Sequence, residues 1–183
     1  LGASFSSKSW SAADGNTILD RLTYGVYKST NAGASFARIN SITNGSDLEH
    51  VNDLEVQTVS NRIWLSTHTM MPSSKFGTPV GGRFWYSDDG TTFTRATPSY
   101  PGYPAVNPDN IQRTEIAPSA TDTNTHYVLM RVTGTASGTI PIIYKTTDKF
   151  TNLTYIPAPA DADTGIPDQD FTRGQSYYDL EIE

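Results

Sequence analysis

Short segments of β-branched and aromatic residues recur along this chain, and Gly, Pro, Asn and Asp separate them. Helical periodicity is almost absent, so the pattern predicts an all-β fold. The central segments at 63–65 and 127–130 are apolar at successive positions rather than at alternate ones. Strands of this kind are buried on both faces, which predicts sheets that are stacked between neighbouring sheets.

The segments fall into two complete units, 53–97 and 111–156, and each unit predicts four antiparallel strands. The expected strands lie at 53–59, 62–67, 83–86 and 93–97, and at 112–117, 126–132, 141–145 and 153–156. A half unit at 24–40 precedes them, and 178–183 predicts the first strand of another unit.

One turn is written three times, at 27–36, 86–93 and 144–153. In each copy a hydroxyl residue follows an opening tyrosine. Fifty-eight residues separate Ser29 from Ser87, and 59 separate Ser87 from Thr146. A repeat of this length indicates one supersecondary unit stacked on copies of itself.

The residue types in these turns have local structural roles. Asn or Asp two positions after the hydroxyl accepts backbone hydrogen bonds, glycine supplies a positive φ, and the closing aromatic residue is expected to bury its ring against the sheet. In the third copy Phe150 and Leu153 stand at the glycine and aromatic positions. The predicted turn residues are Ser29, Asn31, Gly33, Phe36, Ser87, Asp89, Gly90, Phe93, Thr146 and Asp148.

A second repeat has the same phase. The phrases at 53–56, 113–116 and 179–182 each contain a central glutamate. Sixty residues separate Glu55 from Glu115, and 66 separate Glu115 from Glu181. Two repeats of different composition with one period indicate that the units share one plan.

The turns resemble the Asp-box of BNR-repeat β-propellers, of which the sialidase-like and sortilin-like families are examples. The resemblance implies blades of four antiparallel strands. Propellers close with about 4 to 8 blades, and at roughly 60 residues per blade this chain of 183 residues predicts an incomplete ring. We expect 1–183 to be part of one β-propeller, completed by the remainder of a larger protein or by a second copy.

The segment 171–180 resembles the phrase that opens blades in large secreted Bacteroidetes proteins, many of which carry a type IX secretion signal. This resemblance implies a secreted or cell-surface location. The composition agrees with it, since the chain has no cysteine and only 17% charged residues. The formal net charge of −6 argues against nucleic acid as a partner, and no apolar run is long enough for membrane insertion.

Four residues are candidates for the channel side of the ring: Glu55, Glu115, Glu181 and Arg173. Xyloglucanase-like glycoside hydrolases use paired carboxylates across a cleft. Repetition of glutamate at equivalent positions argues against such a pair, because an acid and a base need different environments. Sialidases carry an arginine triad, a Tyr/Glu nucleophile pair and an early Phe-Arg-Ile-Pro motif. The segment at 36–39 is not that motif, and no Tyr/Glu pair can be assigned. No residue is therefore assigned a catalytic role.

The loop at 161–170 contains Asp161, Asp163, Asp168 and Asp170. Oxygen-rich loops of this kind bind Ca²⁺, although the spacing is not that of an EF-hand. The alternative is a solvated acidic loop. Two functions remain open for the chain: a recognition or scaffold module that binds protein or glycan, and part of a glycoside hydrolase propeller.

Overall fold

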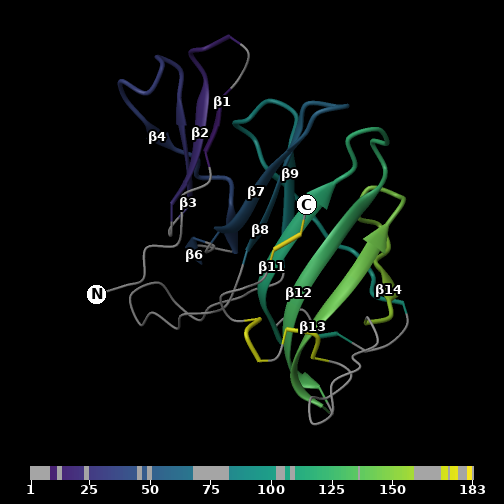
Figure 1. The fold of residues 1–183 in the computed structure, drawn as a ribbon. Helices are drawn as coiled ribbons and strands as arrows, with labels where there is room; N and C mark the ends of the chain where they lie inside the picture. Colours follow the sequence, from purple (N-terminus) through teal and green to yellow (C-terminus); the bar gives the residue numbers. More distant parts are fainter. Residues whose placement is uncertain are drawn as a thin grey trace.

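The computed structural model describes residues 9–11, 14–22, 25–44, 47–48, 51–67, 83–101, 106–107, 110–135, 137–158, 170–172, 174–176 and 181–182. Within these residues the protein is all-β, with three four-stranded antiparallel sheets and one two-stranded sheet (Figure 1). No helix in this part of the chain is long and apolar enough to cross a membrane.

Each large sheet is a meander in which sequential strands are neighbours. The first sheet contains β1 (Ser9–Ser11), β2 (Ile18–Leu22), β3 (Gly25–Ser29) and β4 (Ala37–Arg38). The second contains β7 (Val51–Gln57), β8 (Arg62–Thr67), β9 (Phe84–Ser87) and β10 (Thr94–Ala96). The third contains β11 (Ile111–Pro118), β12 (His126–Thr135), β13 (Gly138–Thr146) and β14 (Thr154–Ile156). The two-stranded sheet pairs β5 (Thr43–Asn44) with β6 (Asp47–Leu48).

The first sheet extends beyond the half unit expected at 24–40. Strands β1 and β2 precede that range and pair with each other and with β3. The sequence of β2 is Ile-Leu-Asp-Arg-Leu, and its two adjacent charged residues do not resemble a buried strand. At the other end, residues 181–182 are not in a strand, while 177–180 and 183 lie outside the described residues.

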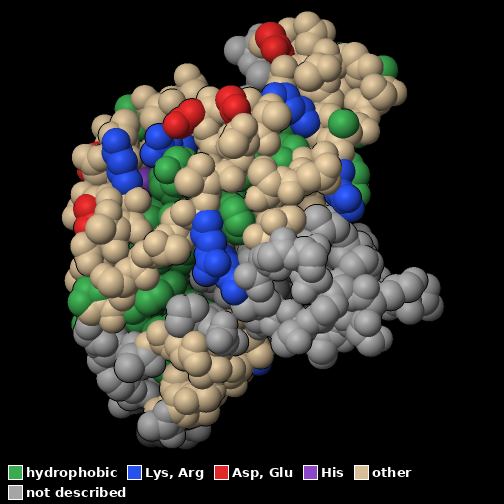
Figure 2. All heavy atoms as spheres, turned by 180° about the vertical axis from the view of Figure 1, so that it is seen from behind, with side chains coloured by type: hydrophobic (Ala, Val, Ile, Leu, Met, Phe, Trp, Pro, Cys, Tyr) green, Lys and Arg blue, Asp and Glu red, His purple; other side chains and the backbone are tan. Residues whose placement is uncertain are grey.

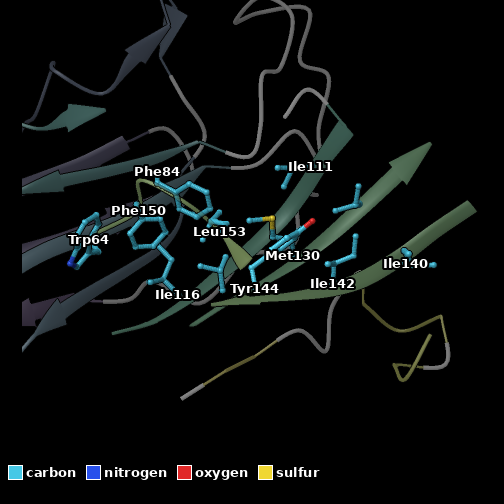
Figure 3. Close-up of a cluster of buried hydrophobic side chains, with 12 residues drawn as sticks. Trp64, Phe84, Ile111, Ile116, Met130, Ile140, Ile142, Tyr144, Phe150 and Leu153 are labelled. Atoms are coloured by element: carbon cyan, nitrogen blue, oxygen red, sulfur yellow. The ribbon is translucent and has the colours of Figure 1, made fainter. Parts of the chain in front are cut away.

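The second sheet is covered on both faces, as its apolar central strand predicts. On β8, Leu65 belongs to the cluster shared with the first sheet, together with Leu19 and Val26. The next residue towards the N-terminus, Trp64, belongs to the cluster shared with the third sheet. Successive residues of a strand point to opposite faces, so one strand supplies both cores. Figure 3 shows the Trp64 side of this arrangement, with the ring beside Phe150.

The three repeated turns connect the third and fourth strands of each large sheet and share one hydrogen-bond pattern. The hydroxyl oxygens of Ser29, Ser87 and Thr146 each accept two backbone N–H groups within their own turn. Each hydroxyl also donates to the Asn or Asp side chain two residues later, at 2.8–2.9 Å. That side-chain oxygen accepts further backbone N–H groups.

The turns differ in how they reach a positive φ. Gly90 has a φ of 62°, whereas Lys149 and Phe150 have φ values of 56° and 63° without being glycine. The Phe150 ring is 1% exposed. Residue 150 therefore combines the backbone conformation that glycine favours with a buried aromatic side chain.

The expectation that Phe36 buries its ring is wrong, because this residue is 44% exposed. A Cβ on Gly33 would lie near both Phe36 and Ile18, which places the ring on the Ile18 side of the first sheet. Leu19 points the other way and packs against the second sheet. Phe93 and Leu153, at the corresponding positions of the other turns, are 4% and 0% exposed.

Candidate functional site

A β-bulge lies at the same place in the second and third sheets. The pairing of β7 with β8 shifts between Val51 and Asp53, and the pairing of β11 with β12 shifts between Ile111 and Thr114. The two bulges are 60 residues apart, which matches the spacing of Glu55 and Glu115. Bulges re-aim side chains, and here the re-aimed residues are polar.

The contact surface between the second and third sheets, called the seam below, contains a buried carboxylate. Asp53 is 0% exposed. Its Oδ2 accepts the backbone N–H of Ile116 at 2.8 Å, and its Oδ1 accepts the N–H of Leu54 at 2.9 Å. A carboxylate is costly to bury without partners. The bond to Leu54 satisfies one oxygen within β7, and the bond to Ile116 joins β7 to β11.

The neighbouring residue of the bulge continues this contact. The side-chain amide of Asn52 donates to the Thr114 carbonyl oxygen and, at 3.0 Å, to Oε1 of Glu115. The same Oε1 accepts Nε of Arg113 at 3.0 Å. Glu115 is 5% exposed. One carboxylate oxygen therefore receives one donor from each sheet.

Further polar contacts join the two sheets along the seam. The hydroxyl of Ser66 donates to the Thr114 carbonyl at 2.6 Å. The side-chain amide of Gln57 donates to the carbonyl oxygens of Ser119 and Asp122 at 3.3 and 2.9 Å. In these bonds, side chains of the second sheet bind backbone carbonyl groups of the third sheet and of its β11–β12 turn. The contacts therefore depend on the position of that backbone rather than on the identity of its side chains.

The seam ends on a group of aromatic and charged side chains. The Trp64 ring lies 4.7 Å from the Phe150 ring and 5.4 Å from the Tyr86 ring, measured between centroids. The Arg62 guanidinium lies over the Tyr86 ring at 4.6 Å and binds both oxygens of Asp88 at 2.7 and 2.8 Å. The hydrogen bonds to Arg62 lower the pKa of the Asp88 carboxyl.

The structure describes three of the four channel-side candidates. Glu55 is opposite Trp64 in the β7–β8 pairing and is partly buried on the face that turns towards the third sheet. Glu115 lies in the seam as described above. Glu181 is exposed and outside any strand, and Arg173 lies outside the described residues.

Of the four aspartates expected to bind Ca²⁺, Asp161, Asp163 and Asp168 lie outside the described residues. Asp170 closes a local turn: its Oδ1 accepts both the N–H and the hydroxyl of Thr172, and its Oδ2 accepts the N–H of Gly174. No group of three or more potential ligands for a metal ion occurs among the residues that the structure describes. The calcium site remains a prediction from the sequence.

Residues Asn52, Arg113, Gln57 and Ser66 were not expected to form a site. One signal was present in the sequence. Asn52 and Asp53 are consecutive polar residues, and the apolar Val51 and Leu54 flank them. Asn and Asp are depleted in strands. A pair of them at such a position indicates a bulge or a buried polar contact.

Comparisons with known proteins place the fold. No family model matches the chain, and no curated protein matches it. Among solved structures, the chain is similar to an ancestral GH74 enzyme with a TM-score of 0.58 and 18% sequence identity, over 87% of this chain and 19% of that one. A GH74 enzyme from Niastella koreensis has a TM-score of 0.49 and 15% identity, over 76% of this chain and 20% of that one.

The chain therefore spans about a fifth of the length of the solved structures it matches. The likeness to the ancestral GH74 enzyme, together with the three four-stranded meanders, identifies the fold as that of an incomplete β-propeller. The three large sheets are its blades.

Proposed function

We propose that this chain is part of a larger secreted or cell-surface propeller that recognises a protein or a glycan and does not itself catalyse a reaction. The observation that supports this function is the use of the buried carboxylates. Both oxygens of Asp53 accept backbone N–H groups, and Oε1 of Glu115 accepts one side-chain donor from each side of the seam. Carboxylates with such partners hold the blades together.

The surface supports the same class of partner. The Lys and Arg side chains on the face in Figure 2 are dispersed rather than gathered into one basic patch. A dispersed arrangement does not favour a phosphate backbone, which calls for clustered cations. Protein and glycan surfaces have no such requirement.

The outward face of the third blade is proposed to pack against another blade of the same polypeptide. Its residues occupy the positions that the second blade uses in the seam: counted from the repeated turn, Tyr127 and Lys145 pair on the third blade as Trp64 and Tyr86 pair on the second. Tyr127 is 37% exposed and has the Lys145 ammonium over its ring at 5.5 Å. In the full-length protein, hydroxyl-radical labelling should spare Tyr127 and modify Val59, which lies in the β7–β8 turn. Equal labelling of both residues contradicts the contact.

A second candidate function is glycoside hydrolysis, because the chain has the fold of part of an ancestral GH74 enzyme. The two functions make different predictions for one substitution. Glu115→Gln keeps an oxygen at the position of Oε1, so a structural Glu115 tolerates it, whereas a catalytic carboxylate does not.

The experiment compares full-length wild type with Glu115→Gln in two assays. A glycan and protein binding screen should give a ligand that both forms bind alike. Release of reducing sugar from xyloglucan and other β-glucans should be undetectable for both. Turnover by wild type that falls at least 100-fold in Glu115→Gln, with the fold retained, would overturn the recognition function and support the hydrolase.

A further inference from the structure

The seam between the second and third blades contains a buried histidine in an aromatic setting. His126 begins β12 and is 0% exposed. Its ring centroid lies 4.6 Å from that of Trp64, at an interplanar angle of 67°, and 4.9 Å from that of Phe150. Trp64 belongs to the second blade and Phe150 to the third, so the imidazole is packed where the two blades meet.

The surroundings of the His126 ring stabilise its protonated, positively charged form poorly. Among the residues that the structure describes, no hydrogen bond of normal geometry reaches Nδ1 or Nε2 of His126, and the backbone of Asn124 favours the charged ring less than burial disfavours it. The nearby Trp64 indole N–H also lacks a hydrogen bond and, as a donor, could not stabilise an imidazolium in any case. A buried cation without an acceptor is strongly disfavoured.

The surrounding charges give no compensating carboxylate in direct contact. Arg62 is a nearby cation, and Asp88 is already bound to it. Asp122 on the third blade is held by Thr125 and by the N–H of Asn124. The charged groups that act on the ring are Arg62 from the second blade and Asp122 from the third.

We propose that His126 makes the contact between the second and third blades acid-labile: protonation of the imidazole loosens the packing of Trp64 against Phe150 and separates the blades at this end of the seam. The proposal concerns the conformation of the chain and is independent of whether the protein binds a glycan or cleaves one. Its geometric basis is the buried ring, its two aromatic neighbours and the lack of a well-formed hydrogen bond to either ring nitrogen among the described residues.

The pH range follows from the two states of the chain. Burial lowers the pKa of His126 from 6.5 to about 4, and this effect outweighs the Asn124 carbonyl and Asp122, which act in the opposite direction. Between these values the unfolded or separated state binds one more proton than the packed state. The equilibrium constant for opening should therefore rise by up to about tenfold for each unit of pH lost between 6.5 and 4.

The test measures urea unfolding and amide hydrogen exchange of wild type and His126→Phe from pH 7.5 to pH 5. Phenylalanine keeps an aromatic ring and cannot be protonated. Wild type should show an opening constant that rises about tenfold or more over this range, with exchange accelerated in β8 and β12. His126→Phe should lose most of that rise. A control variant with His50→Gln and His68→Gln, which retains His126, should keep the rise in the opening constant.

Coincident pH profiles for wild type and His126→Phe would overturn the proposal. Should the variant fail to fold, an NMR titration of the His126 ring in wild type decides the matter. A titration midpoint near 6.5 without a change in β8 or β12 contradicts the proposal, and a midpoint below 5 that coincides with loss of blade contacts supports it.

Discussion

The second and third blades have the same strand order, the same bulge and the same turn, yet the residues at equivalent positions differ. Where the second blade has Asp53, the third has Arg113, 60 residues later. Where the second has Trp64 opposite Glu55, the third has Leu129 opposite Glu115. The shared features belong to the backbone and determine the fold of each blade. The differing side chains lie on the faces that meet a neighbour, so they determine which surfaces fit together.

The largest difference in stability between the two blades is expected at Trp64. This residue is 0% exposed and joins the aromatic core of the seam, so Trp64→Ala should lower the free energy of unfolding by about 3–5 kcal/mol. Leu129→Ala, opposite Glu115 as Trp64 is opposite Glu55, removes a smaller side chain and should cost about 2 kcal/mol. Urea denaturation measures both. Equal losses would show that the seam gives Trp64 no special role.

The carboxylates of the two bulges allow a finer test. Asp53 uses two different oxygens for two backbone N–H groups, and asparagine offers only one oxygen. Asp53→Asn should therefore leave one buried N–H unsatisfied and cost about 2 kcal/mol. Oε1 of Glu115 accepts from Asn52 and Arg113, and glutamine keeps an oxygen at that position, so Glu115→Gln should cost less, about 1 kcal/mol. Chemical denaturation ranks the two variants, and the reverse order contradicts the assignment of bonds.

The blades were predictable from the sequence because their signals are local. Turn residues at a fixed spacing and apolar runs at 63–65 and 127–130 define hairpins and two-sided burial without knowledge of the partner. Arg62–Thr67 begins and ends where the pattern placed it. The first two strands were missed because β2 carries Asp20 and Arg21 side by side, which masks the strand pattern.

The seam was not predictable because it depends on contacts between residues about 60 positions apart. Nothing local in the sequence tells that Asp53 accepts the N–H of Ile116. The same limit explains Phe36: its turn matches the pattern, but its exposure depends on what covers the Ile18 side of the first blade. Glu55 and Glu115 were placed on the correct strands, while the direction of their side chains follows from the register.

The repeated turn gives a prediction of smaller size. Gly90 has a φ of 62°, and a Cβ there would lie 3.3 Å from Cδ1 of Ile63. Gly90→Ala should therefore cost about 1 kcal/mol. Lys149 already has a φ of 56° and an exposed side chain, so Lys149→Gly relieves the backbone and should stabilise the protein by about 0.5 kcal/mol. Thermal unfolding shows whether each substitution stabilises or destabilises the protein. Destabilisation by both would contradict the view that residues 90 and 149 occupy the same left-handed position of the turn.

The smallest effect is expected at the outer ion pair, where the blades differ in charge. Asp88 pairs with Arg62 on the second blade, and the side chain of Asp88 is 63% exposed. Asp88→Asn should lower stability by less than about 1 kcal/mol, and by less still in high salt, because solvent screens an exposed pair. Lys145→Met on the third blade removes a cation over Tyr127 and should show little dependence on salt.

The pH dependence of the Asp88 contribution has a defined sign. Its folded pKa is lowered below the usual 3.8 by the hydrogen bonds from Arg62, so the folded state binds this proton less readily than the unfolded state. The contribution is therefore complete above about pH 4 to 5 and is lost as the pH falls through the folded pKa. The His126 contribution is lost in the higher range between 6.5 and 4. A difference between wild type and Asp88→Asn that disappears already at pH 6 would contradict this separation of the two acid effects.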